Sequence, residues 1–274
     1  MESLNQQIEN HYFKAGLFED IITRLEEQGN DINSVSRVDI AGVDEFHVRG
    51  AAVSREIAGS IDITGCKVLD VGCGLGGPCR MLADEFDCIT TGIDLSEEYI
   101  RTARKLSELV GLDHKTTFVQ GDATALPFED GTFDVVWTQH VQMNIPDKKT
   151  FYAEINRVLK TGGHFIYYDI FKKGNGQVTY PMPWASHADC SFLFKKEEMD
   201  EILGRLELVR KQSTDQTQAG IDFFEALMSK LAEFGPPKIG LNVLMEETTK
   251  PKLTNVLAHL KNGALMLQSG VYAK

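Results

Sequence analysis

The segment VLDVGCGLGG at residues 68–77 restricts the fold of this chain more than any other stretch. Its first four residues have the apolar character of a short buried strand, and a predicted helix begins at Pro78. Between them stand Gly72, Gly74 and Gly76, which let the backbone turn sharply and approach a ligand with no Cβ in the way. A strand, a tight turn and a helix in this order predict an α/β sheet with a ligand site beyond the carboxyl end of the strand.

The same alternation of strand and helix continues to residue 170. Strands are predicted at residues 66–71, 88–93, 116–120, 133–138 and 164–170, with helices at 78–86, 96–110 and 147–159. Strands that alternate with helices pair in parallel through right-handed crossovers. The predicted fold class is therefore α/β, with a doubly wound, Rossmann-like sheet.

The two ends of the chain have a different pattern. Apolar residues recur at helical spacing through most of residues 4–57. After residue 171 comes a loop rich in Gly, Pro and aromatic residues. We expect further helices at residues 196–203, 219–233 and 245–260, and strands at 206–211 and 264–271.

Composition excludes several classes of protein. The chain has 274 residues, with 40 acidic against 28 basic side chains and a formal net charge of −12. Binding to nucleic acid requires Lys and Arg to neutralise phosphates, so no nucleic-acid partner is expected. No apolar run reaches the ~18 residues of a membrane span, and the first residues lack the pattern of a secretory signal. We therefore expect a cytoplasmic protein without membrane insertion; a homodimer is one open possibility for its assembly.

The metal-binding residue types show no pattern of a metal site. The five cysteines include no C-x-x-C pair, which argues against a disulfide framework or a structural zinc site. His187 and Asp189 lack two further ligands at suitable spacing. No metal is expected.

The glycine turn alone does not show which cofactor the chain binds. Gly72, Gly74 and Gly77 also satisfy the dinucleotide fingerprint G-x-G-x-x-G, and Asp94 is placed to hold an adenosine ribose in either case. Asp70 ends the strand beside the turn, where its charge would repel a pyrophosphate but not a sulfonium. Asp122 follows the third strand and can accept a hydrogen bond from an adenine amine, with Phe128 or Leu126 beside the base.

The ordered segments VLDVGCGLGG, GIDLS, GDATALPF, FDVVW and RVLKTGGHF resemble class I S-adenosylmethionine-dependent methyltransferases over about residues 40–171. Within them the chain is similar to the group of sarcosine/dimethylglycine N-methyltransferases and ubiquinone-type C-methyltransferases. The resemblance implies S-adenosyl-L-methionine as cofactor and S-adenosyl-L-homocysteine as product. It also implies a seven-stranded sheet whose last strand is antiparallel and lies between the fifth and sixth strands.

The resemblance also implies roles for individual residues. The glycines of the turn would wrap the methionine part, Asp94 would hold the ribose, and Asp122 with Ala123 would meet adenine. Arg49, in the segment FHVRG, is a candidate partner for the cofactor carboxylate. The full set of candidate cofactor-binding residues is Arg49, Asp70, Gly72, Gly74, Gly76, Asp94, Leu95, Asp122, Ala123 and Gln139.

Methyl transfer needs alignment of the acceptor and exclusion of water, and needs a base only if the acceptor must lose a proton. His140 follows the fourth strand and is the candidate base; the alternative is that it only packs near the cofactor. Five residues are candidates for binding the acceptor: Met143, Tyr168, Asp169, Tyr180 and Trp184.

The chain is thus expected to hold an N-terminal helical cap segment at residues 1–60 and a methyltransferase domain at residues 61–274. Within the domain we expect a substrate loop near residues 172–194 and cap helices near residues 215–262. The expected function is methyl transfer to a small molecule, with an amine of the sarcosine or dimethylglycine kind as the leading acceptor and transfer to carbon or oxygen as the alternative. An NAD-dependent oxidoreductase and a non-catalytic protein that binds an adenosine ligand are alternatives from other classes.

Overall fold

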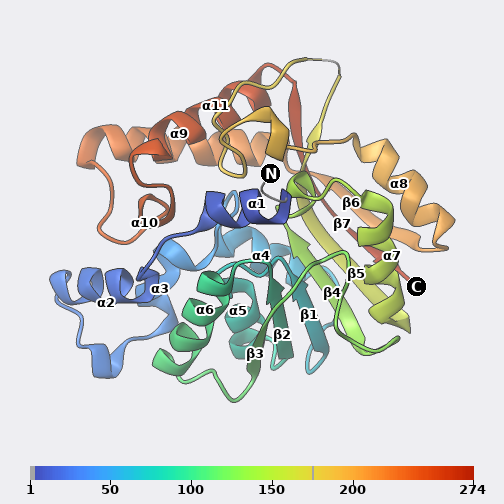
Figure 1. Cartoon of the computed structure of the whole chain (residues 1–274), viewed down its shortest axis with the longest axis horizontal. Coiled ribbons are helices and arrows are strands. Elements are labelled where there is room, and N and C mark those ends of the chain that lie inside the picture. Colours follow the sequence, from blue (N-terminus) through green and yellow to red (C-terminus); the bar gives the residue numbers. More distant parts are fainter. Residues whose placement is uncertain (1–3, 175) are drawn as a thin grey trace.

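The computed structural model describes residues 4–174 and 176–274 and contains a single mixed sheet of seven strands in the order β3-β2-β1-β4-β5-β7-β6 (Figure 1). The strands β1 to β5 run parallel to one another, and β7 is antiparallel to both β5 and β6. The expected α/β class and the insertion of the last strand between the fifth and sixth are both confirmed. The strands are β1 Lys67–Val71, β2 Ile89–Asp94, β3 Thr116–Gln120, β4 Phe133–Gln139, β5 Leu159–Lys172, β6 Val209–Asp215 and β7 Leu265–Ala273.

Helices flank the sheet and extend from both ends of the chain. The α-helices are α1 Leu4–Tyr12, α2 Leu17–Glu27, α3 Arg37–Asp44, α4 Ala51–Ala58, α5 Gly77–Glu85, α6 Glu97–Leu109, α7 Lys148–Val158, α8 Lys196–Arg205, α9 Thr217–Phe234, α10 Asn242–Met245 and α11 Thr249–Lys261. Short 3₁₀ turns occur at Ile32–Ser34, Gln142–Asn144, Ala188–Cys190 and Glu246–Thr248.

Alternating side chains of the central strands build a core on each face of the sheet. Val68 of β1 and Trp137 of β4 belong to the core that includes α4, α5, α9 and α11. Leu69 and Val136, one residue away in each strand, belong to the core formed with α7 and α8. Successive residues of a strand point to opposite faces, so burial of both faces requires the nearly continuous apolar runs seen in these strands.

The helices outside the alternating pattern gather at one edge of the sheet. Figure 1 shows α9 and α11 side by side above the strands, with α1 lying between them and the carboxyl ends of the central strands. Both α9 and α11 contact β7, whereas α2 contacts α6 and α4 contacts α5. The proposed boundary near residue 60 falls in the connection between α4 and β1.

The structure differs from the sequence-based elements mainly in four places, and the first is β5, which begins at Leu159 rather than at residue 164. The sixth strand begins at Val209 rather than residue 206, because Leu206 caps α8 and Glu207 has a left-handed backbone with φ +62°. Helix α3 was not predicted, although the backbone N–H of Ser36 donates to Asp39 Oδ2 at 2.8 Å, a recognisable helix start. The helix expected at residues 245–260 is divided into α10, a 3₁₀ turn and α11.

In the part of the chain that the structure describes, residues 4–174 and 176–274, no helix combines the length and apolar character that a bilayer crossing requires.

Candidate functional site

The glycine turn after β1 forms one wall of a cavity at the carboxyl edge of the sheet. Gly72, Gly74 and Gly76 have φ values of +75°, +54° and +81°, a conformation that favours glycine. A Cβ at Gly72 would lie 2.4 Å from a methyl group of Val141, and one at Gly76 would lie 2.5 Å from the Phe118 ring. A Cβ at Gly74 would meet nothing within 4 Å, so this part of the backbone faces open space.

The cavity, which we call the donor cavity, has a volume of about 230 Å³. It collects residues that follow β1, β2, β3 and β4, together with residues of α1 and of the segment between α3 and α4. Eight of the ten candidate cofactor residues line it, namely Asp70, Gly72, Gly74, Asp94, Leu95, Asp122, Ala123 and Gln139. Gly76 and Arg49 do not line it.

Asp94 is held rigidly at the end of β2. Its Oδ2 accepts a hydrogen bond from the backbone N–H of Gly74, and its Oδ1 accepts one from Ser96, both at 2.9 Å. Burial raises the pKa of the Asp94 carboxyl, and these two backbone hydrogen bonds oppose that effect. A carboxylate oriented in this way retains free lone pairs with which to accept from a diol in the cavity.

Asp70 lies at the end of β1, 2% exposed, between the turn and the sheet. Burial raises the pKa of its carboxyl to about 7, and the charges of Asp94 and Glu45 add to this effect. The acidic side chains of Asp70, Asp94 and Glu45 interact with one another beside the glycine turn, so a further anion placed there would add to this repulsion. This electrostatic environment fits a cationic group and does not fit a diphosphate.

Asp122 links the third strand to the N-terminal helix. Its Oδ1 accepts from the backbone N–H of Thr124 at 2.8 Å, while its Oδ2 accepts from the Asn5 side chain of α1 at 2.8 Å. At the other end of α1, the Tyr12 hydroxyl donates to Asn144 Oδ1 at 2.9 Å. These contacts hold α1 across the donor cavity.

His140 follows β4 directly and lines the donor cavity. It adopts a left-handed backbone with φ +54°, and its N–H donates to the Tyr168 carbonyl at 2.8 Å. Burial and the neighbouring His47 hold the pKa of the His140 imidazole well below its usual range. Its Nε2 is buried and has no hydrogen-bond partner among the described residues. A neutral imidazole with a free nitrogen is a competent proton acceptor.

A buried polar network joins the cavity to the segment between α3 and α4. Ser54 donates to Glu45 Oε2 at 2.6 Å and lies 3.0 Å from His47 Nε2. Gln139 donates to the Ser54 hydroxyl at 3.2 Å and accepts from the Trp137 indole at 2.9 Å. The network fixes the orientation of His47, whose ring centre lies 6.0 Å from that of His140.

Arg49, the predicted partner of a cofactor carboxylate, is engaged elsewhere. Its guanidinium donates to Glu56 Oε2 and to Gln216 Oε1, each at 2.8 Å. A cofactor role would require these contacts to break, so the role stays a prediction. Gly76 likewise acts through packing, because its missing Cβ makes room for Phe118.

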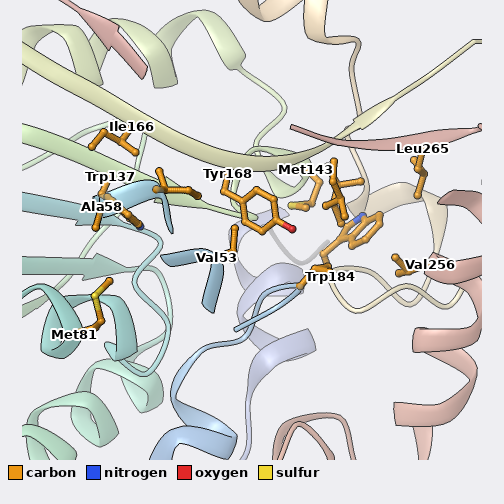
Figure 2. Close-up of a cluster of buried hydrophobic side chains, with 14 of the residues drawn as sticks. Val53, Ala58, Met81, Trp137, Met143, Ile166, Tyr168, Trp184, Val256 and Leu265 are labelled. Carbon is orange, nitrogen blue, oxygen red and sulfur yellow. The ribbon is translucent and has the colours of Figure 1, made fainter. Parts of the chain in front are cut away.

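None of the five candidate acceptor residues lines the donor cavity. Met143, Tyr168 and Trp184 are buried, and Figure 2 shows them among apolar neighbours such as Val53 and Val256. The half-buried Tyr180 packs against the same core. These positions give no support for an aromatic cage around a methylated ammonium group, and acceptor binding by these residues stays a prediction.

Asp169 is buried near the carboxyl end of β5 and follows Tyr168 in that strand. Burial raises the pKa of its carboxyl to about 8, although the Lys148 ammonium opposes this shift. Its Oδ1 has no hydrogen-bond partner within residues 4–174 and 176–274.

Sequence reasoning missed the residues that cover the cavity from the N-terminal side. Asn5, Ile8 and Tyr12 of α1 line it, and so does Tyr99 of α6. The four-residue spacing of Ile8 and Tyr12 is visible in the sequence, but the same spacing is typical of any helix that packs on a core. For metals, the described residues contain no group of three or more His, Cys, Asp or Glu side chains arranged to hold an ion.

A family model described as a methyltransferase domain matches residues 69–167. A fatty-acid O-methyltransferase of Mycolicibacterium smegmatis is 31% identical over 217 residues, which cover 77% of this chain and 74% of that protein. A glycine/sarcosine/dimethylglycine N-methyltransferase of Actinopolyspora halophila is 30% identical over 253 residues, or 86% of this chain and 40% of that protein.

Other curated relatives are also much longer than the part that aligns. The chain spans 28% of a fungal sterol 24-C-methyltransferase and 49% of a plant tocopherol O-methyltransferase. Among solved structures, the geranyl diphosphate C-methyltransferase of Streptomyces coelicolor is similar in fold, with a TM-score of 0.72 and 15% identity. That match covers 98% of this chain and 97% of the other.

Proposed function

Because this chain belongs to the class I S-adenosylmethionine-dependent methyltransferases, we propose that it transfers a methyl group from S-adenosylmethionine, the cofactor of that family, to a small-molecule acceptor. One observation carries the proposal. The left-handed backbone at Gly74 faces an open cavity in which Asp94, Asp122 and the buried Asp70 converge.

The residues of the donor cavity fit this cofactor. Two backbone N–H groups hold Asp94 in the cavity, and we assign it the ribose diol. We assign Asp122, which also lines the cavity, the adenine amine. When bound, the cofactor supplies a methyl carbon on a cationic sulfur, and the carbon–sulfur bond breaks with its electron pair on sulfur as the acceptor bonds to the carbon. Asp70 lowers the electrostatic cost of placing positive charge near the turn.

We propose His140 as the candidate general base. An acceptor hydroxyl, ammonium or acidic C–H must lose a proton for transfer, and we assign the Nε2 of His140 to accept it. Burial keeps this imidazole neutral before the transfer, through a lowered pKa, and also disfavours the imidazolium that forms. The buried network around His47 and α1 above the cavity exclude water from the reacting atoms.

For the acceptor, we retain an amine of the sarcosine or dimethylglycine kind as the first candidate. The N-methyltransferase of Actinopolyspora halophila aligns over 86% of this chain, which supports this choice. Transfer to oxygen or carbon is the second candidate, and the aligned fatty-acid O-methyltransferase supports it over 77% of the chain. The net charge of −12 favours an acceptor other than nucleic acid. A cytoplasmic location and a homodimer remain part of the proposal.

A radiolabelled transfer assay tests the proposal. The chain is incubated with methyl-labelled S-adenosylmethionine and panels of amines, phenols and quinol precursors. The expected result is a labelled product in one panel. Cofactor binding without transfer to any panel would favour a non-catalytic adenosine-ligand binding protein, and oxidation or reduction with NAD would favour an oxidoreductase.

A further inference from the structure

A second and larger cavity lies beside the donor cavity, and His47 lines both. We call it the cap groove. Its volume is about 1420 Å³, above the roughly 300–1,000 Å³ of common small-ligand pockets. Its apolar wall comes mainly from α9, from the connection to α10 and from α11, and includes Phe223, Leu227, Met228, Leu231, Ile239 and Leu253.

The face of α9 in the groove is apolar but only partly covered. Phe223, Leu227 and Leu231 recur every four residues and therefore form one stripe along the helix. All three are only partly buried. Met228 lies beside the stripe with a flexible side chain that adapts to a ligand of varied shape. A continuous apolar stripe of this length matches a hydrocarbon chain rather than a compact polar molecule.

The groove also contains a buried cation without a counter-ion. Lys252 of α11 is 6% exposed, yet no carboxylate of the described residues forms an ion pair with its ammonium. Burial lowers the pKa of Lys252, and no nearby acidic group opposes the shift. In contrast, Lys14 pairs with Asp20 at 2.8 Å and Arg49 pairs with Glu56 at 2.8 Å. The Lys252 ammonium is therefore a groove cation without an ion-pair partner among the described residues, and an anionic ligand group would supply that partner.

We propose that the cap groove binds the methyl acceptor, and that this acceptor is an anionic amphiphile with a hydrocarbon chain along α9 and an anionic group beside Lys252. The inference rests on the proposed methyl transfer, and within that proposal it favours the second candidate, transfer to oxygen or carbon, over the amine. His47 lines both cavities, so the cap groove and the donor cavity adjoin at this residue.

Equilibrium titrations of the whole chain, saturated with S-adenosylhomocysteine, test the acceptor class with three probes below their micellar concentrations. Dodecanoate has both features, butanoate lacks the long chain, and dodecylamine has the opposite charge. We expect dodecanoate to bind at equimolar stoichiometry and at least tenfold more tightly than either other probe. Equal affinity for butanoate, or tighter binding of dodecylamine, would overturn the inference.

Matched variants of α9 locate the binding site. Ala232 and Ala226 are both exposed, but only Ala232 lines the cap groove. Ala232→Trp fills the groove without removing a core contact and should weaken dodecanoate binding at least fivefold, whereas Ala226→Trp should not. Lys252→Gln should weaken dodecanoate binding to a similar extent and should not weaken dodecylamine binding.

The affinity for S-adenosylhomocysteine separates the two proposals. It should be unchanged in all three variants, which also reports that each is folded. Dodecanoate affinity that Ala232→Trp leaves at the wild-type value contradicts the inference even if Lys252→Gln fails to fold. A wild-type chain that binds dodecanoate but not S-adenosylhomocysteine would refute the methyltransferase function instead.

Discussion

The carboxyl edge of the sheet and the helical cap above it are built in different ways. At the edge, backbone conformation sets the geometry, since Gly72 and Gly74 have left-handed φ values and Asp94 is held by two backbone N–H groups. In the cap, side chains from distant segments set the geometry. Tyr12 of α1, for example, donates a hydrogen bond to Asn144, and Lys252 of α11 lines the cap groove. A site made from local backbone geometry tolerates few sequences, whereas a wall of packed side chains tolerates many. We therefore expect the donor cavity to tolerate few substitutions and the cap groove to tolerate many.

The strongest test of this contrast is Gly72→Ala. The new Cβ would lie 2.4 Å from Val141 in a left-handed backbone, so strain and overpacking should weaken S-adenosylhomocysteine binding roughly a hundredfold in calorimetry. Gly162→Ala is the matched control, because Gly162 has φ +82° and nothing within 4 Å of a new Cβ. Equal affinities in the two variants would show that the turn does not define the site.

A second test concerns His140, which lies where the two regions meet. His140→Ala should leave S-adenosylhomocysteine affinity unchanged and lower methyl-transfer turnover by about a hundredfold, the usual contribution of a general base. The exposed His114 provides the control, and His114→Ala should retain full turnover. Undiminished turnover in His140→Ala would remove this residue from any role in proton transfer.

A third test addresses the ribose contact. Asp94→Ala should weaken S-adenosylhomocysteine binding at least tenfold, because a carboxylate that accepts charged hydrogen bonds contributes about 1.5–3 kcal/mol. Asp113→Ala changes an exposed aspartate near the same strands and should have no effect. Affinity that is the same in both variants would rule out the ribose contact.

A fourth test uses the pH dependence of stability. The folded-state pKa of Asp70 is raised to about 7 by burial, so the folded chain holds a proton there that the unfolded chain has lost. The free energy of unfolding should therefore fall as pH rises from about 4 toward 7. Asp70→Asn should flatten this fall and raise Tm at pH 8 by a few degrees. Identical pH profiles for the two chains would mean that Asp70 ionises freely in the fold.

The smallest expected effect lies in the cap. Tyr12→Phe removes the hydrogen bond to Asn144 and keeps the ring, so S-adenosylhomocysteine affinity should fall only about two- to tenfold. Tyr180→Phe, on an aromatic residue away from the donor cavity, is the control and should have no effect. A loss as large as that of Gly72→Ala would show that the cap specifies the donor as strongly as the sheet does.

The contrast also explains which features the sequence predicts. The glycine turn, Asp94 and Asp122 were recognisable because each follows a strand at a position that backbone geometry fixes. The number of strands and the antiparallel last strand between the fifth and sixth followed from the family resemblance, and both are confirmed.

The cap was less accessible to prediction for a physical reason. Met143, Tyr168 and Trp184 were expected on the acceptor wall but are buried in the core. An apolar pattern shows that a side chain avoids water, but does not show whether a neighbour or a ligand covers it. The close approach of Gly42 in α3 to Ile239, where a Cβ would lie 2.4 Å from the carbonyl oxygen, joins segments nearly 200 residues apart. No local signal predicts such contacts.

Calorimetric titration of the wild-type chain with S-adenosylhomocysteine and, separately, with NADH tests the central claim most directly. The expected result is a single site with micromolar affinity for S-adenosylhomocysteine and no heat of binding for NADH. Binding of NADH alone would contradict the assignment of the donor cavity to a sulfonium cofactor.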